Sequence, residues 1–503
     1  MRRQIFNHQK KVWNVVSGLT FSSFQKSYAP RSGGESSNMT DSNVNLKWLS
    51  EECPEFCIPS KSIQILKEPS EFFQKLKEYS TSAKKRITLA SLYIGTGVLE
   101  KELVSCIQNC LDVSKGNVKV HILVDYTRGS RGKENTRTLF LPLLKLYHPQ
   151  MKVSLYHTPK LRGFIKWLLP ERWNETIGLS HLKVYLFDDT LLLSGANLSD
   201  QYFTNRQDRY IVFHNCKELC NYFDQLVFTV SSFSFNLNPD NTVNLQDGWN
   251  IHPIKGNFKK FIEKAQSKLE EFIQFSKKQQ SSNSIKNTSD FQNDTFVYPL
   301  LQLYTFGIRQ DEKVTEKFLC SAEDSSRIKL ASGYFNLTNH YMNIILNSTK
   351  ALFDLLVASP KVNGFYGASG VSGAIPMAYT HIAKTFFKEV IKNKQENRIK
   401  LHEYERSGWT FHVKGLWYYK PNAKLPSVTF IGSPNFGYRS VYKDLEAQVV
   451  IVTENKELQR QLHEEQQTFY DRTNLVNEKL FERPDRKVSL WVKLVTFFIR
   501  DFF

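Results

Sequence analysis

The feature that most constrains this chain is a set of four sequence elements that recur in the same order in its two halves. They are an apolar string of strand-like composition, a His-x-Lys motif, a turn of small residues ending in asparagine, and an acid eleven positions beyond that asparagine. In the first half these are residues 86–93, His181-Leu-Lys183, residues 194–197 and Asp208; in the second they are residues 327–334, His412-Val-Lys414, residues 432–435 and Glu446. Four features rarely recur in one order by chance, so the chain is predicted to contain a duplicated domain.

Apolar, β-rich runs alternate with longer helical patterns in both halves. In the first half the strand-like runs cover 87–93, 118–124, 183–187, 191–194 and 210–213, and helical patterns cover 72–79, 98–110 and 138–146. In the second half the strand-like runs cover 328–332, 353–358, 415–419, 428–432 and 447–452. This alternation predicts an α/β fold of two lobes, each a central sheet flanked by helices. The order of the strands is not predicted.

Two polar stretches divide the chain. Residues 32–45 follow a basic leader, and residues 277–294, rich in Gln, Ser, Asn and Lys, lie near the middle. Both are typical of loops or linkers. The predicted organisation is a leader with its linker (1–45), a first lobe (46–276), a linker (277–294), a second lobe (295–486) and a basic-aromatic C-terminal segment (487–503). The length of 503 residues allows each lobe a core of its own.

The first 34 residues contain six Arg and Lys residues and no Asp or Glu. Apolar side chains between positions 5 and 19 recur at near-helical spacing. This composition is typical of a transit peptide. The alternative is a disordered basic arm.

The net charge of +18 favours an anionic partner: nucleic acid, an acidic lipid surface or a phosphorylated substrate. Charge alone does not choose among the three.

The seven cysteines include three pairs spaced four apart and lack the two-plus-two pattern of a zinc site. We therefore predict reduced thiols and no metal site.

A histidine and a lysine two positions apart on a strand project from the same face, so both can reach one phosphate. Imidazole is a nucleophile or a general acid or base near neutral pH, and the ammonium group offsets charge on phosphate oxygens. Two such pairs in one site supply one histidine to attack phosphorus and another to protonate the leaving group. A single His-x-Lys would more often be a surface or core pair, and the duplication is what favours catalysis.

Further polar residues near the motifs are candidates for supporting roles. A carboxylate against the far ring nitrogen of a histidine would fix its tautomer, and the candidates are Asp188, Asp208 and Glu446. The side chains of Asn197, Asn435 and Ser433 can donate hydrogen bonds to phosphate oxygens. An anionic acceptor would require Arg or Lys, and Arg206, Arg209 and Arg439 lie close to the motifs in sequence.

The string His181-Leu-Lys183, followed by four residues and Asp188, resembles the motif of the phospholipase D superfamily, and His412-Val-Lys414 resembles its second copy. The resemblance implies two lobes with one active site between them, a phosphohistidine intermediate, and a catalytic set of His181, Lys183, Asp188, His412 and Lys414. It also implies chemistry that requires no cofactor, although a divalent metal can take part in binding a CDP-lipid. The second copy departs from the motif, because Tyr419 stands where the aspartate is expected.

Strings at 90–97, 168–175, 363–367 and 412–418 resemble the mitochondrial branch of that superfamily that makes phosphatidylglycerophosphate. This likeness implies CDP-diacylglycerol and glycerol 3-phosphate as substrates, release of CMP, and a product on the route to phosphatidylglycerol and cardiolipin. It implies His181 as nucleophile and His412 as acid and base, a peripheral position on the matrix side of the inner mitochondrial membrane, and no nucleic-acid partner. The alternatives are a phosphatidylserine or cardiolipin synthase, or a phosphodiesterase acting on nucleic acid.

A glycine-containing segment follows the first repeated string. Its backbone N–H groups can cradle a phosphate of CDP or of ATP, and a structural turn is an equal alternative. The segment consists of Ser91, Leu92, Tyr93, Ile94, Gly95, Thr96, Gly97 and Val98. No P-loop motif is present in the sequence, which disfavours a P-loop ATPase.

Two basic-aromatic segments, 161–173 and 488–503, are candidates for contact with an anionic membrane surface. Ordinary core packing is the alternative for each. No uncharged apolar run approaches the roughly 20 residues that a membrane-spanning helix needs. The sequence does not predict the oligomeric state.

Overall fold

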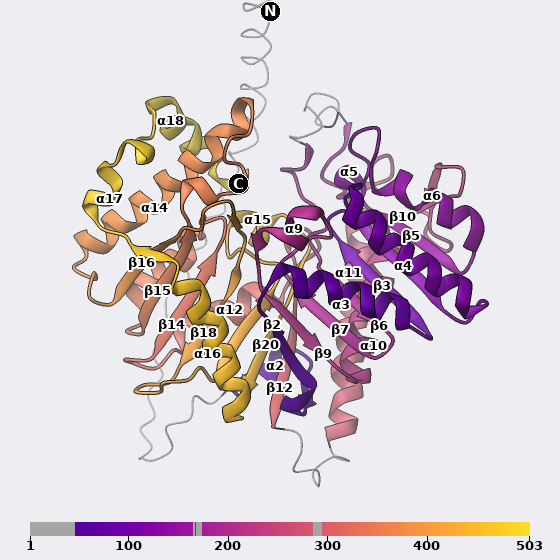
Figure 1. Cartoon of the computed structure of the whole chain (residues 1–503), viewed down its shortest axis with the longest axis horizontal. Coiled ribbons are helices and arrows are strands. Elements are labelled where there is room, and N and C mark those ends of the chain that lie inside the picture. The colour runs from indigo at the N-terminus through magenta and orange to yellow at the C-terminus, as the bar shows by residue number, and fades with distance from the viewer. Residues whose placement is uncertain (1–45, 164–165, 167–173, 285–293, 503) are drawn as a thin grey trace, which may run out of the picture.

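Two central β-sheets, one in each lobe, form the frame of the computed structural model (Figure 1). The structure describes residues 46–163, 166, 174–284 and 294–502. The predicted leader at 1–45 and residues 285–293 of the predicted linker lie outside the described residues, as does most of the basic-aromatic segment at 161–173.

The first sheet has nine strands, with three parallel strands at its centre and antiparallel neighbours on both sides. In spatial order they are β11 (Val243–Leu245), β10 (Phe235–Leu237), β5 (Met151–Tyr156), β4 (Lys119–Asp125), β3 (Arg86–Ser91), β6 (Val184–Phe187), β7 (Thr190–Ser194), β9 (Tyr210–Phe213) and β2 (Ile63–Leu66).

The second sheet has ten strands and repeats this arrangement. In spatial order they are β1 (Phe56–Ile58), β12 (Thr295–Leu303), β20 (Glu446–Thr453), β19 (Val428–Gly432), β18 (Lys414–Tyr419), β14 (Arg327–Ser332), β15 (Leu352–Ala358), β16 (Ile399–Tyr404) and β21 (Thr473–Leu475), while β13 (Ile308–Arg309) pairs with β12. The order β5-β4-β3-β6-β7-β9-β2 matches β16-β15-β14-β18-β19-β20-β12 strand for strand. The matching order confirms the predicted α/β fold and the duplication.

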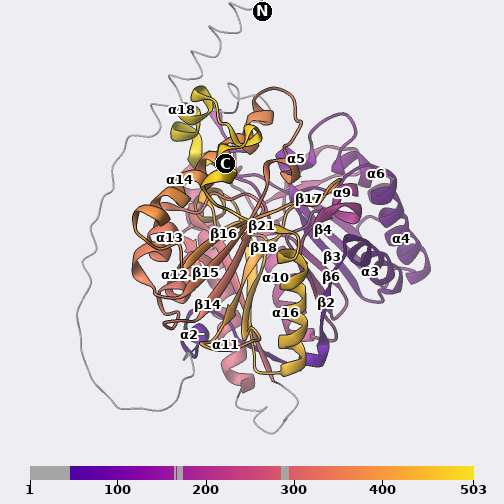
Figure 2. The same cartoon turned by 60° about the vertical axis from the view of Figure 1, so that its left-hand side comes forward.

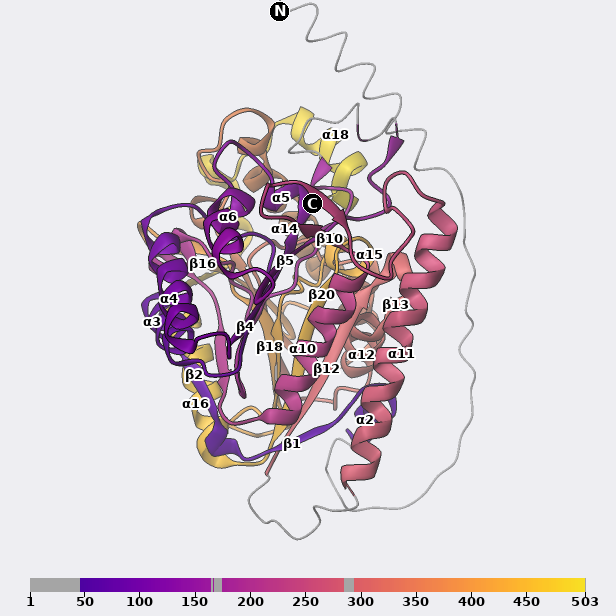
Figure 3. The same cartoon turned by 90° about the vertical axis from the view of Figure 1, so that its right-hand side faces the viewer.

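Both faces of each sheet are buried, and helices cover them. The outer face of the first sheet packs on α3 (Pro69–Ser82), α4 (Val98–Ser114), α6 (Thr136–Tyr147) and α9 (Asp200–Thr204). The outer face of the second packs on α2 (Trp48–Glu52), α12 (Gln310–Cys320), α13 (Asn339–Asn343), α14 (Ile375–Lys392) and α17 (Glu478–Glu482). The inner faces meet in a shared core with α10 (Lys217–Ser232), α11 (Phe258–Ser284) and α16 (Lys456–Tyr470), as Figures 1 and 3 show.

The alternation of side chains along β6 shows how the sequence specifies these layers. Val184 and Leu186 point into the core between the lobes, whereas Tyr185 and Phe187 point into the outer core. Successive strand residues face opposite sides of a sheet, so a strand buried on both faces is apolar throughout. The run at 183–187 was predicted as a strand from its apolar, β-rich composition, and burial on both faces explains that composition.

Two segments lie elsewhere than the predicted division of the chain places them. Helix α2 and strand β1 belong to the second lobe, because β1 pairs with β12 although it precedes the whole first sheet in sequence (Figure 3). Helix α11 continues to Ser284, inside the predicted linker, because its apolar side packs in the core between the lobes. Among the described residues, no helix is both long enough and apolar enough to span a membrane.

Candidate active site

The two His-x-Lys motifs meet between the lobes, each anchored to the backbone of the opposite lobe. The N–H of His181 donates to the carbonyl of Leu445 at 2.8 Å, and the N–H of His412 donates to the carbonyl of Gln207 at 2.8 Å. Near the second contact, β8 (Arg206–Gln207) pairs in parallel with β17 (Thr410–Phe411). Lys414 begins β18 as predicted, but residues 181–183 precede β6, because this segment makes its backbone contacts with the other lobe.

Each histidine is held by the acid of the other half. Nδ1 of His181 lies 2.9 Å from Oε2 and 3.1 Å from Oε1 of Glu446, and Nδ1 of His412 lies 2.6 Å from Oδ2 of Asp208. An ionised carboxylate only accepts, so these contacts favour the tautomer with the proton on Nδ1 and a lone pair on Nε2. The structure thus brings together the two predicted histidines with two of the three predicted acids.

Both lysines are buried beside their histidines. Nζ of Lys183 donates to the carbonyl of His181 at 2.8 Å, and Nζ of Lys414 lies 2.8 Å from Nδ1 of His412 and 3.9 Å from Oδ2 of Asp208. Burial lowers the pKa of both ammonium groups, and the nearby carboxylates partly offset this. A bound phosphate would stabilise their charged form.

Gly195 creates the room that Lys414 needs. A Cβ at Gly195 would lie 2.8 Å from both Asp208 Oδ1 and Lys414 Nζ, which is closer than non-bonded atoms approach. The glycine of the small-residue turn in the first half is therefore required for the charge cluster of the second motif.

The electrostatic environment keeps both imidazoles neutral. Burial lowers the pKa of His181 and of His412 well below its usual range, and the ammonium groups of Lys183 and Lys414 lower it further. Burial also raises the pKa of Asp208 to about 6 and raises the pKa of the Glu446 carboxyl. A neutral imidazole with a free Nε2 is the form that can attack phosphorus.

The two histidines differ in what faces Nε2. The hydroxyl of Tyr202 lies 3.2 Å from Nε2 of His412 and accepts a hydrogen bond from Asn197 Nδ2 at 3.1 Å. The equivalent residue of the second half, Ser440, instead donates to Oε1 of Glu446 at 2.8 Å. The His181 side chain is 13% exposed and that of His412 is 4% exposed. Within the described part of the chain, no side chain bonds to Nε2 of His181.

The remaining predicted phosphate donors have other bonds. The Ser433 hydroxyl donates to the carbonyl of Ala447 at 3.2 Å and accepts from its N–H at 3.1 Å, and its interaction with the Glu446 carboxyl partly offsets the rise in pKa that burial causes in that group. The Asn197 side chain donates to the Tyr202 hydroxyl, which in turn contacts Nε2 of His412. The side-chain carbonyl oxygens of Asn197 and Asn435 are buried and accept no hydrogen bond from the described residues.

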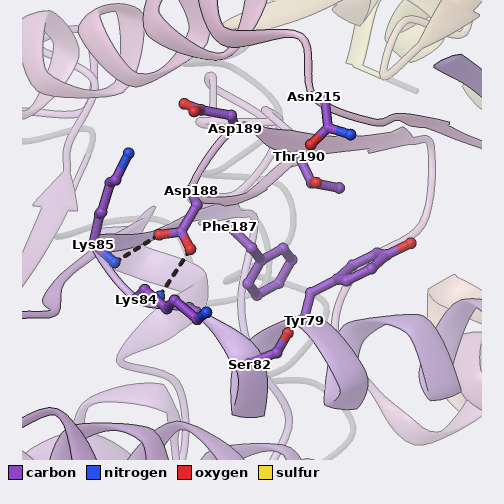
Figure 4. Close-up of a pocket in the computed structure, with 10 residues that line it drawn as sticks. Tyr79, Ser82, Lys84, Lys85, Phe187, Asp188, Asp189, Thr190 and Asn215 are labelled. Carbon is purple, nitrogen blue, oxygen red and sulfur yellow. Dashed lines mark hydrogen bonds between the residues drawn. The ribbon is translucent and has the colours of Figure 1, made fainter.

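Asp188 lies outside the cluster, although it was predicted as catalytic from its place in the motif. Its carboxylate accepts from the backbone N–H groups of Lys84 at 2.8 Å, Lys85 at 2.7 Å and Arg86 at 3.0 Å, in a surface pocket (Figure 4). The reason is geometric, since the whole of β6 separates Asp188 from Lys183 and a strand rises about 3.3 Å per residue. Asp188 organises the start of β3.

The segment 91–98 forms a turn around a buried carboxylate. A Cβ at Gly95 or at Gly97 would collide with the Glu100 side chain, and Oε1 of Glu100 accepts from the N–H of Asp200 at 2.7 Å. The N–H of Gly95 donates to the carbonyl of Leu198 at 2.9 Å. These contacts explain both glycines as parts of a turn. The Glu100 carboxylate would repel a phosphate bound at this position. Nucleotide binding by this segment therefore stays a prediction.

Sequence reasoning missed the tyrosines that surround His412. The rings of Tyr202 and Tyr334 meet the His412 ring edge to face, at centroid distances of 5.1 and 5.4 Å. The repeat contained a signal for one of them, because Tyr93 and Tyr334 both end the repeated apolar string. Tyr202 had no such signal, since Ser440 stands in its place in the other half.

The cysteines and the side chains that could ligate a metal bear on the predictions made for them. All seven cysteines have free thiols, as predicted. Among residues 46–163, 166, 174–284 and 294–502, no group of three or more His, Cys, Asp or Glu side chains is arranged to hold a metal ion.

Comparison with known proteins gives a consistent result. The chain is 48% identical over 478 residues to the human mitochondrial CDP-diacylglycerol–glycerol-3-phosphate 3-phosphatidyltransferase, covering 91% of this chain and 86% of that protein. It is 49% identical to the chicken protein of the same name over 91% of this chain and 86% of that one, and 35% identical to the Saccharomyces cerevisiae enzyme over 88% of each. No protein-family model matches the chain. Among solved structures, phosphatidylserine synthase from Haemophilus influenzae has the same fold, with a TM-score of 0.68 at 20% identity, covering 90% of this chain and 96% of that one.

Proposed function

Because the chain belongs to the family of CDP-diacylglycerol–glycerol-3-phosphate 3-phosphatidyltransferases, we propose that its two His-x-Lys motifs carry out that transfer in one site. The phosphatidyl group of CDP-diacylglycerol passes to glycerol 3-phosphate, and CMP is released. The observation that supports this most directly is the pair of histidines, each with a carboxylate on Nδ1 and a lysine alongside. This arrangement suits two displacements at phosphorus.

In the first step, Nε2 of His181 attacks the phosphorus that bears the diacylglycerol. The bond between that phosphorus and the oxygen bridging the two phosphates breaks, and CMP leaves with that oxygen. In the second step a hydroxyl of glycerol 3-phosphate attacks the same phosphorus, His412 accepts the hydroxyl proton, and the N–P bond breaks. Phosphatidylglycerophosphate leaves, His181 is free again, and His412 releases the proton to solvent. Lys183 and Lys414 offset charge on the non-bridging oxygens throughout.

The asymmetry of the two histidines supports this division of labour. His181 is the more exposed, and its Nε2 faces no hydrogen-bond donor among the described residues, whereas Nε2 of His412 accepts from Tyr202. A nucleophile needs an open approach to phosphorus. An acid and base can remain within a hydrogen-bonded chain.

The test is CMP release from CDP-diacylglycerol in mixed micelles, with glycerol 3-phosphate, serine, phosphatidylglycerol or water as acceptor. We expect release that depends on glycerol 3-phosphate and is lost in both His181→Ala and His412→Ala. After acid quench, labelled lipid should be bound covalently to the wild-type protein and absent from His181→Ala. A covalent adduct that persists in His181→Ala would reverse the two roles. Preference for another acceptor would contradict the proposed substrate.

We also propose that the chain is a mitochondrial protein that works on the matrix face of the inner membrane, with the C-terminal helix α18 (Leu490–Ile499) against the lipid. Val492 and Thr496 are buried against the protein, but the other side of α18 carries large exposed apolar side chains. These are Leu490 (82% exposed), Trp491 (51%), Leu494 (58%) and Phe497 (80%). A helix with such a face suits the interfacial region of a bilayer.

The position of α18 fits this role. Arg500, just beyond the helix, donates to the Asn336 side chain at 3.0 Å and lies over the ring of Tyr438 in α15 (Tyr438–Tyr442) at 5.2 Å. Helix α15 also carries Ser440, which contacts Glu446. Figures 1 and 2 show α18 at the same end of the molecule as α5 (Tyr126–Gly129) and α14. A bilayer against α18 would thus lie beside the end where the motifs meet.

Vesicle flotation tests the membrane proposal. We expect Leu494→Glu/Phe497→Glu to lose binding to vesicles that contain anionic phosphatidylglycerol and to retain activity on CDP-diacylglycerol dissolved in detergent. Val113→Glu, at an exposed apolar position at the end of α4, serves as the matched control and should bind as the wild type does. Unchanged flotation of the double variant would contradict the role of α18.

For the chemical steps we propose that no cofactor is required, because the two lysines supply the positive charge at phosphorus. A divalent metal would then act only on the diphosphate of the donor. Formation of the covalent adduct with and without a chelator measures this, and an adduct that forms only with metal present would contradict it.

A further inference from the structure

Arg206 is a buried cation without a carboxylate partner in the part of the chain that the structure describes. Its side chain is enclosed, with the residue 9% exposed, and its Nε donates to Thr410 Oγ1 at 2.9 Å. One Nη donates to the side-chain oxygen of Gln201, and the guanidinium lies 4.7 Å from the ring centre of Tyr202. All of these partners are neutral.

Four other cations near the site interact with carboxylates. Lys414 lies 3.9 Å from Asp208, Arg439 lies 3.0 Å from Asp444, and Arg209 lies 2.8 Å from Glu465. Lys183 interacts with the charge of Glu446. The titratable groups that interact most strongly with Arg206 are the tyrosines 93, 202 and 334, together with His412 and Lys414. A buried charge is costly unless it is paired, so the working complex is expected to bring an anion to Arg206.

The guanidinium lies one aromatic ring away from the reacting histidine. The ring of Tyr202 contacts both groups, since its centre lies 4.7 Å from the Arg206 guanidinium and 5.1 Å from the centre of the His412 ring. A Cβ at Gly364 would lie 2.8 Å from the hydroxyl of Tyr334 and 3.3 Å from Nη2 of Arg206. The guanidinium, this hydroxyl and the bare Cα of Gly364 therefore converge on one point.

We propose that Arg206, with the Tyr334 hydroxyl, binds the phosphate of the acceptor and so selects glycerol 3-phosphate over uncharged alcohols. The proposal rests on the proposed function and names the residues that recognise the acceptor. The acceptor must present a hydroxyl to His412 while its phosphate lies nearby, and Arg206 is a buried cation one aromatic ring from His412 that has no carboxylate partner among the described residues. A planar guanidinium suits a phosphate dianion, with which it can form two parallel hydrogen bonds. Arg209 and Arg439 are less suited to this role, because each already pairs with a carboxylate.

The same chemistry could serve the diphosphate of the donor, so the experiment must separate the two. Exchange of labelled CMP into CDP-diacylglycerol without acceptor reports the donor step, and synthesis at varied glycerol 3-phosphate reports the acceptor step. For Arg206→Gln we expect the KM for glycerol 3-phosphate to rise about 10- to 100-fold, the loss typical of a charge-assisted hydrogen bond. The exchange rate should stay within about twofold of wild type, and Arg206→Lys should recover part of the loss. Arg460→Gln, an exposed arginine on α16, is the matched control.

Free glycerol is the second probe. If Arg206 recognises the phosphate, Arg206→Gln should lower kcat/KM for glycerol 3-phosphate and leave that for glycerol unchanged. Gly364→Ala, whose methyl group would press against the Tyr334 hydroxyl and the Arg206 guanidinium, should shift the same ratio. If Arg206→Gln lowered CMP exchange and synthesis to the same extent and raised the KM for CDP-diacylglycerol, Arg206 would bind the donor. That result would overturn the proposal. An equal loss with both acceptors would also overturn it. A wild-type protein without CMP exchange would instead contradict the proposed covalent mechanism.

Discussion

Nδ1 of His181 lies 2.9 Å from Oε2 of Glu446, and the two residues belong to different lobes. The equivalent contact of the other motif joins Nδ1 of His412 to Oδ2 of Asp208 at 2.6 Å. Each half of the duplicated chain thus supplies the histidine of one pair and the acid of the other. The repeat places the acid eleven residues beyond the asparagine in both halves. In the folded chain, each acid contacts the histidine of the other half and not that of its own.

The first prediction concerns these carboxylates. In Asp208→Asn and in Glu446→Gln the amide can donate to Nδ1, which would move the ring proton to Nε2 and block its lone pair. We expect kcat to fall about 10³- to 10⁴-fold, as when a triad aspartate becomes asparagine in a serine protease. Glu446→Gln should lose the covalent adduct, whereas Asp208→Asn should form it and fail to pass it to the acceptor. Steady-state CMP release and acid-quench trapping measure the two effects.

Asp247→Asn, at an exposed position, is the control for this experiment. An Asp208→Asn enzyme with wild-type kcat would show that the carboxylate does not position His412.

The second prediction is a pH dependence. Burial raises the pKa of Asp208 to about 6, and only its ionised form accepts the Nδ1 proton of His412. The rate of the acceptor step should therefore fall as the pH drops through about 6. The sign for stability is opposite: a carboxyl whose folded-state pKa is raised stabilises the fold below its unfolded pKa, and this contribution is lost as the pH rises through about 6.

Single-turnover rates of transfer from the trapped adduct, measured against pH, test the first effect. Thermal unfolding of the wild type and of Asp208→Asn over the same range tests the second. An acceptor step that is independent of pH down to about pH 5 would contradict the assignment to Asp208.

The third prediction separates Asp188 from the chemistry. Asp188→Asn removes charge from an acceptor of three backbone N–H groups, and we expect a loss of about 1 to 3 kcal/mol in unfolding free energy. The kcat should stay within about twofold of wild type, because β6 separates this residue from Lys183. Urea unfolding and CMP release are the measurements, with Asp189→Asn as the neighbouring control. Lost turnover at unchanged stability would restore the catalytic role that the motif suggests.

The fourth prediction concerns the ion pair that joins the lobes. Arg209 bonds to Glu465 at 2.8 Å and to the carbonyl of Phe430 at 2.7 Å, with both charged side chains fully enclosed. Arg209→Met leaves a buried charge unpaired and should cost about 3 to 5 kcal/mol in unfolding free energy. The double variant Arg209→Met/Glu465→Gln should recover part of this loss. Urea midpoints of the four proteins test it, and strictly additive effects would contradict a direct pair.

The repeated motifs explain which parts of the site could be predicted. His181, His412 and their lysines recur in one order, so duplication identified them, and the acids Asp208 and Glu446 followed from the same spacing. The exchange of acids between lobes has no local signature, because it depends on how the two sheets face each other. Tyr202 and the unpaired state of Arg206 are likewise properties of contacts between distant segments.

The strands were predicted for a related reason. Strand β6, at 184–187, is apolar on both faces because both faces are buried, and that composition is visible in the sequence. The place of β1 was not predicted, since three residues that pair with β12 carry too short a pattern to indicate a sheet. The role assigned to Asp188 rested on its position in the motif, whereas its hydrogen bonds depend on where the turn after β6 lies.

The exchange of acids between the lobes makes activity a property of the complete chain. A ribosome that has not yet reached Glu446, or a protease that has cut between the lobes and released one of them, leaves His181 without the carboxylate that orients it. Neither fragment alone contains a complete histidine-acid pair. If the proposed mechanism holds, we therefore expect unfinished or damaged molecules to be unable to take the lipid group from its donor and lose it to water, because the histidine-acid pairs are assembled only when both halves are folded against each other.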